Sequence, residues 1–392
     1  MKKLLAITLV FGVLFSLCGC GATKTETKKK VKITVDYPID KYDLDAYTLP
    51  YWAGDVVYQE SVLPVENKSG KVADITLLYP AEQIVSVRSS NLQVEFEEGK
   101  DYELVNGKLR ILAKGSIPTV KYKDFYPEFA TNTSMPLNSN YGTGYIYYSE
   151  GAAMHNMQIA VTYTHKGTFP GEIPAYKGDQ LPKTTAKLAN GEALNICVYG
   201  DSISTGLNSS GKVGAAPNAA PWFQMFLDKL TLAYPDSAIT LNNPSVSGKK
   251  SDWGAQEAGP NVGYGPDLCI IAFGMNDGTK QYTVEFFRQN IQNIITAARR
   301  GNPDCEFILV STMLANPEAD NFAGTQKAYL PALLEMEEEG IVVMDMTTFH
   351  EALLSRKQYQ DMSGNNVNHP NDFLARGYAQ VLWQTLIGYE EN

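Results

Sequence analysis

The sequence has few of the residues that build metal centres and disulfide scaffolds. Its 392 residues include 5 cysteines and 4 histidines, and no two cysteines have the C-x-x-C spacing of redox or zinc motifs. Cys197, Cys269 and Cys305 lie in or beside apolar runs, which predicts buried free thiols. We therefore expect chemistry without a metal and without a cofactor, carried by ordinary side chains.

Positive charge is also scarce. Lys and Arg number 33 against 43 Asp and Glu, which gives a formal net charge of −10. Nucleic acids and anionic membrane surfaces attract basic proteins, so this balance argues against both as partners. Any membrane contact should come from an attached lipid.

No apolar run is long enough to span a membrane, but one at the N-terminus has the length of a signal peptide. Lys2 and Lys3 precede the apolar stretch 4–17, and "LCGC" follows it. This resembles the lipobox of bacterial lipoproteins with Cys20 as the lipidated residue, because Cys18 would put bulky Leu17 at the cleavage site. We expect residues 1–19 to be a lipoprotein signal peptide and 20–30 a flexible tether, which places the protein outside the cytoplasm, anchored to a bacterial membrane by its lipid.

Residues 31–176 have the texture of β-structure. Short runs rich in Val, Ile, Tyr and Thr are separated by Gly, Pro, Asn and Asp, and Asn106-Gly107 is a hairpin turn pair. Many short strands at this spacing predict an all-β sandwich of the jelly-roll kind. The polar segment 177–193, punctuated by Pro and Gly, is expected to be a connector.

Residues 194–392 alternate between strand-like and helical stretches. The strands, such as "NICVY" and "CEFILVS", are nearly continuous apolar runs, as in a parallel sheet covered on both faces. This alternation predicts a doubly wound α/β domain. In such sheets, functional residues lie on loops beyond the carboxyl ends of the strands.

Polar residues at those ends form a set suited to acyl transfer. Ser202 follows the first strand, Gly248 the second and Asn276 the third, while His369 lies in the loop before the last helix. A serine hydroxyl can attack a carbonyl while the histidine takes its proton. The amides of Ser202 and Gly248 and the Asn276 side chain can then stabilise the oxyanion.

These residues resemble those of the SGNH, or GDSL, hydrolases. "GDSIS", "SG" and "GMND" match the family in order and spacing over residues 194–388. The resemblance implies a flavodoxin-like three-layer α/β/α domain, with Ser202 as nucleophile, His369 as base and an oxyanion hole made by Ser202, Gly248 and Asn276. Some bacterial carbohydrate esterases of the family also combine a β-sandwich with this domain.

One position departs from the family pattern. The family usually has Asp three residues before the catalytic His, and here that residue is Asn366. An amide cannot stabilise imidazolium as a carboxylate does. Three arrangements are compatible with this: a Ser–His dyad with Nδ1 held by a backbone carbonyl or by Asn366, substitution by Asp361, or an impaired enzyme.

Two further features lie near the predicted site. Trp253, in polar "KKSDWGAQ", is a candidate for stacking on a sugar ring, whereas Trp222 fits the core face of a helix. The stretch 206–213, "GLNSSGKV", approaches the P-loop pattern but ends in Val213, so we interpret it as a loop rimming the site.

The function expected from these observations is an ester hydrolase that removes O-acetyl groups from a polysaccharide. The first alternative is a lipase or lysophospholipase acting on longer acyl chains, which would need an apolar channel. The second is a surface carbohydrate-binding protein with an impaired hydrolase domain, for which Asn366 is the only support.

Overall fold

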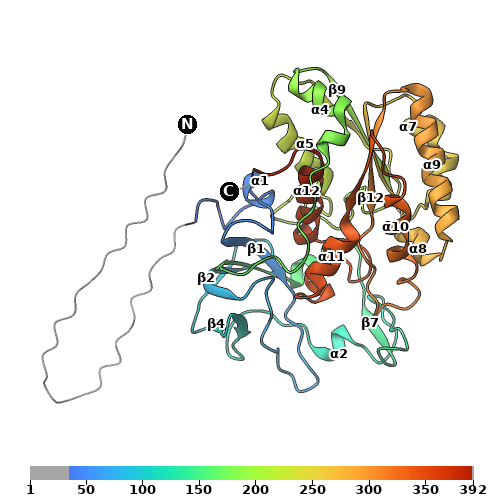
Figure 1. Cartoon of the computed structure of the whole chain (residues 1–392). Coiled ribbons are helices and arrows are strands. Elements are labelled where there is room, and N and C mark those ends of the chain that lie inside the picture. The colour runs from blue at the N-terminus through green and yellow to red at the C-terminus, as the bar shows by residue number, and fades with distance from the viewer. Residues whose placement is uncertain (1–34, 391–392) are drawn as a thin grey trace, which may run out of the picture. The chain divides into compact units, whose positions relative to one another are not determined.

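Five parallel strands form the central sheet of the C-terminal half in the computed structural model, which describes residues 35–390 (Figure 1). Their order is β10-β9-β11-β12-β13, so the chain crosses from one side of β9 to the other between β10 and β11. The strands are β9 (Leu194–Gly200), β10 (Ile239–Asn242), β11 (Leu268–Ala272), β12 (Glu306–Ser311) and β13 (Ile341–Asp345).

Helices cover both faces of this sheet. Successive side chains of a strand point to opposite faces, so these apolar strands make both faces apolar, and both have to be buried. Ile196 and Val198 belong to the core on one face, and Cys197 and Tyr199 to the core on the other. The first face is covered by α4 (Pro182–Ala189), α5 (Trp222–Ala233), α11 (Met346–Leu354) and α12 (Asp372–Leu386). The second is covered by α6 (Ser251–Gln256), α7 (Ala258–Val262), α9 (Val284–Gly301) and α10 (Tyr329–Leu334), and the short α8 (Met275–Thr279) follows β11. The predicted three-layer α/β fold is confirmed.

The N-terminal region is built mainly of antiparallel strands, as expected. One sheet has the order β1-β8-β2-β3, and two hairpins stand beside it. The sheet strands are β1 (Val56–Val62), β2 (Ala81–Ser89), β3 (Glu95–Phe96) and β8 (Ile159–His165); the hairpins are β4 (Tyr102–Val105) with β5 (Lys108–Ile111) and β6 (Ser134–Pro136) with β7 (Tyr145–Tyr147). Asn106 and Gly107, both with positive φ, form the predicted turn between β4 and β5. Three short helices complete the region: α1 (Leu44–Tyr47), α2 (Tyr122–Phe125) and α3 (Ala153–Met157).

The segment 177–193, expected to be a connector, contains α4 and a short 3₁₀ helix, η1 (Gly178–Gln180). Leu181 and Leu188 from this segment are buried in the core. The remaining 3₁₀ helices are η2 (Gln326–Ala328) and η3 (Tyr359–Asp361).

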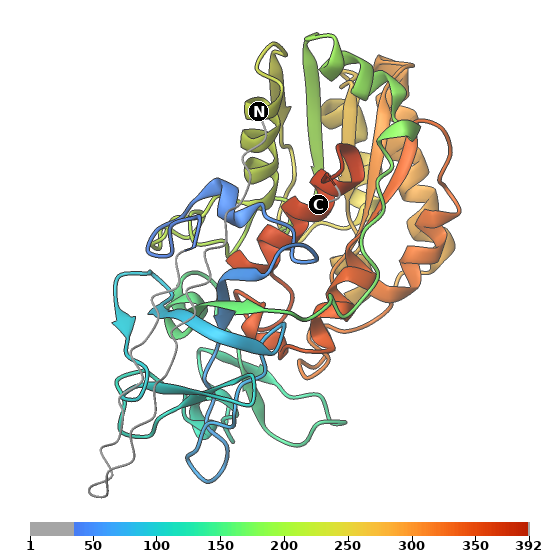
Figure 2. The ribbon, with the colours of Figure 1, turned by 60° about the vertical axis from the view of Figure 1, so that its left-hand side comes forward.

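The antiparallel sheet and the parallel-sheet half share one hydrophobic core, and the described residues 35–390 group as one compact unit. The β1 strand lies beside α12 in both views (Figures 1 and 2). The guanidinium of Arg376 on α12 is buried and donates to the carbonyls of Tyr58 and Gln59 at 2.7 and 3.3 Å. Lys357 and Glu60, both fully buried, form an ion pair between the two halves. The N-terminal region is therefore fixed against the sheet that carries the candidate site.

Within residues 35–390, no helix combines the length and apolar character needed to cross a membrane. Cys20 and the predicted signal peptide and tether lie outside the described residues.

Candidate active site

Ser202 stands just beyond the carboxyl end of β9, the strand on whose two sides the sheet order diverges. Such switch points are where open α/β sheets bind their ligands. Gly200, the last residue of β9, is required by close packing: a Cβ there would lie 2.4 Å from the Ala272 carbonyl oxygen and from Ser204 Oγ. The strand can therefore run close beside β11 before it turns.

Asp201 shapes the turn that presents Ser202. Its Oδ1 accepts a hydrogen bond from the Ile203 amide at 3.0 Å, an Asx-turn contact. Burial, and then the nearby Asp277 charge, raise the pKa of the Asp201 carboxyl to about 7. Asp201 thus serves the backbone of the turn, and the structure gives it no contact with His369.

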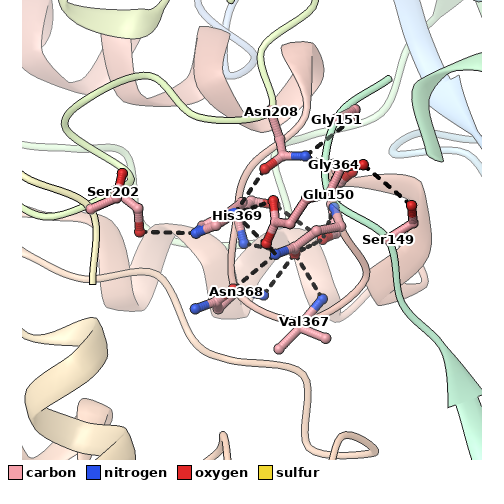
Figure 3. A network of polar contacts seen from close by, with 12 residues as sticks. Ser149, Glu150, Gly151, Ser202, Asn208, Gly364, Val367, Asn368 and His369 are labelled. Atoms are coloured by element: carbon pink, nitrogen blue, oxygen red, sulfur yellow. Dashed lines mark hydrogen bonds and ion pairs between the residues drawn. The ribbon is translucent and has the colours of Figure 1, made fainter. Parts of the chain in front are cut away.

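His369 and Ser202 meet as the sequence predicted. Nε2 of His369 lies 2.9 Å from Ser202 Oγ, and both side chains are buried (Figure 3). The loop before α12 brings the histidine there: the Ser363 hydroxyl and the Gly364 amide both donate to the His369 carbonyl, at 3.0 and 2.9 Å. This distance is within the range that a nucleophile and its general base need.

The other ring nitrogen of His369 faces Asn208. Asn208 Oδ1 is 2.8 Å from Nδ1, while its Nδ2 donates to the carbonyls of Gly151 and Gly364, both at 3.2 Å. Those two carbonyls fix the amide so that oxygen faces the ring. Asn365 Nδ2 also lies 2.9 Å from Nδ1, but its two hydrogens have acceptors in Glu150 Oε1, at 3.0 Å, and Asn368 Oδ1, at 2.9 Å. Nδ1 of the neutral imidazole then carries the proton toward Asn208, and Nε2 is left as an acceptor for the Ser202 hydroxyl.

Glu150 approaches the same nitrogen from the N-terminal region, on the segment between β7 and α3 (Figure 3). Its Oε2 lies 3.3 Å from His369 Nδ1. Its Oε1 accepts from the Tyr148 hydroxyl and from Asn365 Nδ2, both at 3.0 Å. Asn365 also holds the histidine loop, because its Oδ1 accepts from the backbone amides of Val367, Asn368 and His369.

The Glu150 carboxyl is ionised at neutral pH. Partial burial raises its pKa, but the hydrogen bond and charge attraction with His369, together with the bonds from Asn365 and Tyr148, outweigh burial and lower the pKa to about 2. A negative charge therefore stands beside Nδ1 of the candidate base.

The two residues expected to orient His369 do not reach it. Asn366 donates through Nδ2 to the Tyr147 carbonyl at 2.9 Å. The buried Asp361 carboxylate accepts from the amides of Leu63, at 2.8 Å, and Gln358, at 3.2 Å. Asp361 therefore links the segment of η3 to the end of β1. Neither Asn366 nor Asp361 orients His369, so the expectation for both residues is wrong, and other residues lie next to Nδ1.

Two backbone amides are available as oxyanion donors. Among the described residues, no protein acceptor takes a hydrogen bond from the amide of Ser202 or from that of Gly248. Gly248 is exposed and has φ +76°, and a Cβ there would meet nothing within 4 Å. Its backbone conformation, rather than crowding, therefore calls for glycine. Ser247 Oγ lies 3.4 Å from Thr205 Oγ1, which brings this loop to the Ser202 turn.

The third predicted donor, the Asn276 side chain, points toward the same turn. Its Nδ2 donates to the Lys249 carbonyl at 2.9 Å and to Asp201 Oδ2 at 3.3 Å. The longer of these two bonds is the weaker one, so its hydrogen can be shared with an oxyanion that forms during attack. The bond to Lys249 also ties Asn276 to the loop that carries Gly248.

Replacing Asn276 with alanine should lower kcat for p-nitrophenyl acetate by about 10²- to 10³-fold with little change in KM, because the donor acts on charge that develops in the transition state. Steady-state kinetics measures both constants. Asn261→Ala is the matched control, since Asn261 donates to the Tyr199 hydroxyl and the Glu257 carbonyl. An Asn276→Ala enzyme as fast as this control would remove Asn276 from the oxyanion hole.

The structure gives packing roles to Trp222 and Trp253, the two tryptophans near the predicted site. Trp222 is buried and its Nε1 donates to the Ile203 carbonyl at 2.9 Å, so its expected place in the core is confirmed. Trp253 is half-buried, with its ring centroid 5.9 Å from that of Tyr199 and with Lys249 Nζ 5.4 Å from the ring. Contact between Trp253 and substrate stays a prediction. The three cysteines described, Cys197, Cys269 and Cys305, are buried and free.

Comparison with known families identifies the hydrolase half. Residues 198–378 match the model of the GDSL-like lipase/acylhydrolase family. Residues 198–378 are thus a GDSL-type hydrolase domain, which supports the expected class of carboxylic ester hydrolase. A search of curated proteins gave no significant match.

Several solved structures are similar to this one at low sequence identity. A two-domain esterase (CEX) active on acetylated mannans is 22% identical over 54% of each chain, with a TM-score of 0.44. Axe2, an acetylxylan esterase from Geobacillus stearothermophilus, is 19% identical over 50% of this chain and 95% of its own, with a TM-score of 0.41. The present chain thus spans about half the length of the mannan esterase.

Proposed function

Given a GDSL-type hydrolase domain in the chain, we propose that the protein is a serine esterase that removes acetyl or other short acyl groups from a polysaccharide. The observation that carries the proposal is the 2.9 Å contact between Ser202 Oγ and His369 Nε2, with Nδ1 held by Asn208. The proton on Nδ1 leaves Nε2 free to accept the serine proton.

The reaction follows from this arrangement. Ser202 Oγ attacks the ester carbonyl, and His369 Nε2 takes the hydroxyl proton. The amides of Ser202 and Gly248 and the Asn276 side chain stabilise the oxyanion. His369 then protonates the leaving sugar oxygen, which leaves an acyl-enzyme on Ser202. Water, activated by the same histidine, hydrolyses the acyl-enzyme and restores the hydroxyl.

The surroundings of Ser202 favour a short acyl group. The side chains that contact the Ser202 turn and His369 include four polar ones: Thr205, Ser247, Asn208 and Asn276. A long acyl chain needs an apolar channel, and these polar side chains do not supply one. This favours acetyl esters over the lipase alternative.

A comparison of substrates tests the proposal. Purified residues 20–392 should release acetate from acetylated mannan or acetylated xylan, and should hydrolyse p-nitrophenyl acetate faster than the octanoate. A preference for octanoate would favour the lipase alternative. Binding of the polysaccharide without release of acetate would favour the impaired binding protein.

Export and anchoring through Cys20 are part of the proposal. In a bacterial host, the full chain should be found in the membrane fraction, and Cys20→Ala should release it because the lipid is lost. Equal amounts of both forms in the membrane fraction would contradict anchoring through Cys20.

A further inference from the structure

We propose that Glu150, supplied by the N-terminal β region, is the carboxylate that positions His369 and stabilises its charged form during catalysis. This inference rests on the proposed esterase function. It assigns to a residue of the other half of the chain the task that an aspartate near the histidine performs elsewhere in the family. The β region then contributes a positioning residue to the site.

The geometry divides the task on Nδ1 between two residues. Asn208 Oδ1, at 2.8 Å, is the closer acceptor and selects the tautomer. Glu150 Oε2, at 3.3 Å, brings the negative charge. When His369 takes the serine proton it becomes an imidazolium, and an amide oxygen alone cannot balance that charge as a carboxylate does.

Titratable groups on the neighbouring segments have other partners. Asp201 binds the Ile203 amide and Asn276. The Asp372 carboxylate accepts from the Ser210 amide at 2.7 Å, His155 Nε2 lies 2.8 Å from the Ala216 carbonyl oxygen, and the Tyr148 hydroxyl donates to Glu150 itself. Among the described residues, Glu150 is the carboxylate that contacts His369.

The segment that carries Glu150 is bound to both loops of the candidate site. Asn366, on the histidine loop, donates to the Tyr147 carbonyl at 2.9 Å. Asn208, on the serine loop, donates to the Gly151 carbonyl at 3.2 Å. Glu150 lies between these two attachment points. Asn366 thus holds the end of β7, three residues before Glu150.

Attachment of the whole β region supports the same placement. The buried pair between Lys357 and Glu60 and the bonds from Arg376 to β1 join the two halves away from the site. A half-exposed carboxylate on a loosely attached domain would spend little time at Nδ1. Here the shared core limits that motion, so the carboxylate is available without rearrangement.

The test is Glu150→Gln, assayed with p-nitrophenyl acetate by steady-state kinetics. We expect kcat at neutral pH to fall by about 10- to 100-fold with little change in KM, because Asn208 still fixes the tautomer while the charge is lost.

Two variants make the result specific. Glu318→Gln is the matched control, because Glu318 accepts from the Tyr126 hydroxyl at 2.8 Å across the same two halves and has no contact with His369. Glu150→Asp should recover part of the lost rate, because it restores the carboxylate.

The outcomes separate this inference from the function on which it depends. An inactive wild-type enzyme, or activity that survives Ser202→Ala, would contradict the proposed function. A wild-type enzyme that depends on Ser202, combined with a kcat of Glu150→Gln like that of Glu318→Gln, would overturn the role of Glu150 alone.

Discussion

Replacing Ser202 with alanine should lower kcat for p-nitrophenyl acetate by about 10⁴-fold or more, because the nucleophile of the acyl-enzyme pathway is lost. Binding should change little, since alanine keeps the backbone amide that contributes to the oxyanion hole. The fold should also be retained: the hydroxyl contacts His369 Nε2, and its removal leaves a small gap in a buried polar site. Single-turnover and steady-state kinetics on the same preparations measure the loss.

Ser204→Ala is the matched control for this experiment. Ser204 is buried two residues away in the same turn, and its hydroxyl has no hydrogen-bond partner among residues 35–390. Its removal should leave kcat within about twofold of wild type, because no hydrogen bond to the site is lost. Equal losses in the two variants would mean that the turn, rather than the Ser202 hydroxyl, limits activity.

The largest effect on stability should come from Lys357→Met. Lys357 and Glu60 are fully buried, and the Glu60 carboxylate also accepts from the Leu78 amide, at 3.0 Å, and the Tyr163 hydroxyl, at 2.6 Å. Removing the ammonium leaves a buried carboxylate without its counter-charge. We expect the free energy of unfolding to fall by about 3–5 kcal/mol. Denaturant unfolding followed by tryptophan fluorescence measures the change.

Two companions to Lys357→Met isolate the buried charge. The double variant Glu60→Gln/Lys357→Met should recover most of the loss, because it removes the uncompensated charge. Lys183→Met breaks the exposed pair with Asp304 and should change the free energy of unfolding by less than about 1 kcal/mol. A double variant no more stable than Lys357→Met would contradict this account of the interface between the halves.

The parallel sheet and the pair Ser202–His369 could be predicted because their signals are local. Apolar runs marked the strands, and the polar residues that follow them had to meet at one edge of the sheet. The helix α4 within segment 177–193 was not predicted, because Pro182 and the glycines of this segment indicate turns. In the structure this proline lies at the first position of α4, where its missing amide donor costs nothing.

The surroundings of Nδ1 could not be predicted in the same way. Glu150 is 219 residues before His369 in sequence and belongs to a region whose composition indicates only strands and turns. Asn208 lies inside "GLNSSGKV", a stretch whose pattern approaches a phosphate-binding loop and does not indicate that its asparagine contacts His369. Both contacts arise from docking of the β region on the hydrolase half, which depends on buried groups such as Arg376 that no local pattern reveals.

Covalent labelling tests the claim that Ser202 is the nucleophile. Diethyl p-nitrophenyl phosphate should react with the wild-type protein until one phosphoryl group is attached per chain, with loss of esterase activity, because a serine activated by His369 attacks phosphorus as it attacks a carbonyl. Peptide mass spectrometry should place the group on Ser202, and Ser202→Ala should remain unlabelled. A label on another residue, or full esterase activity in a protein that does not react, would contradict the claim.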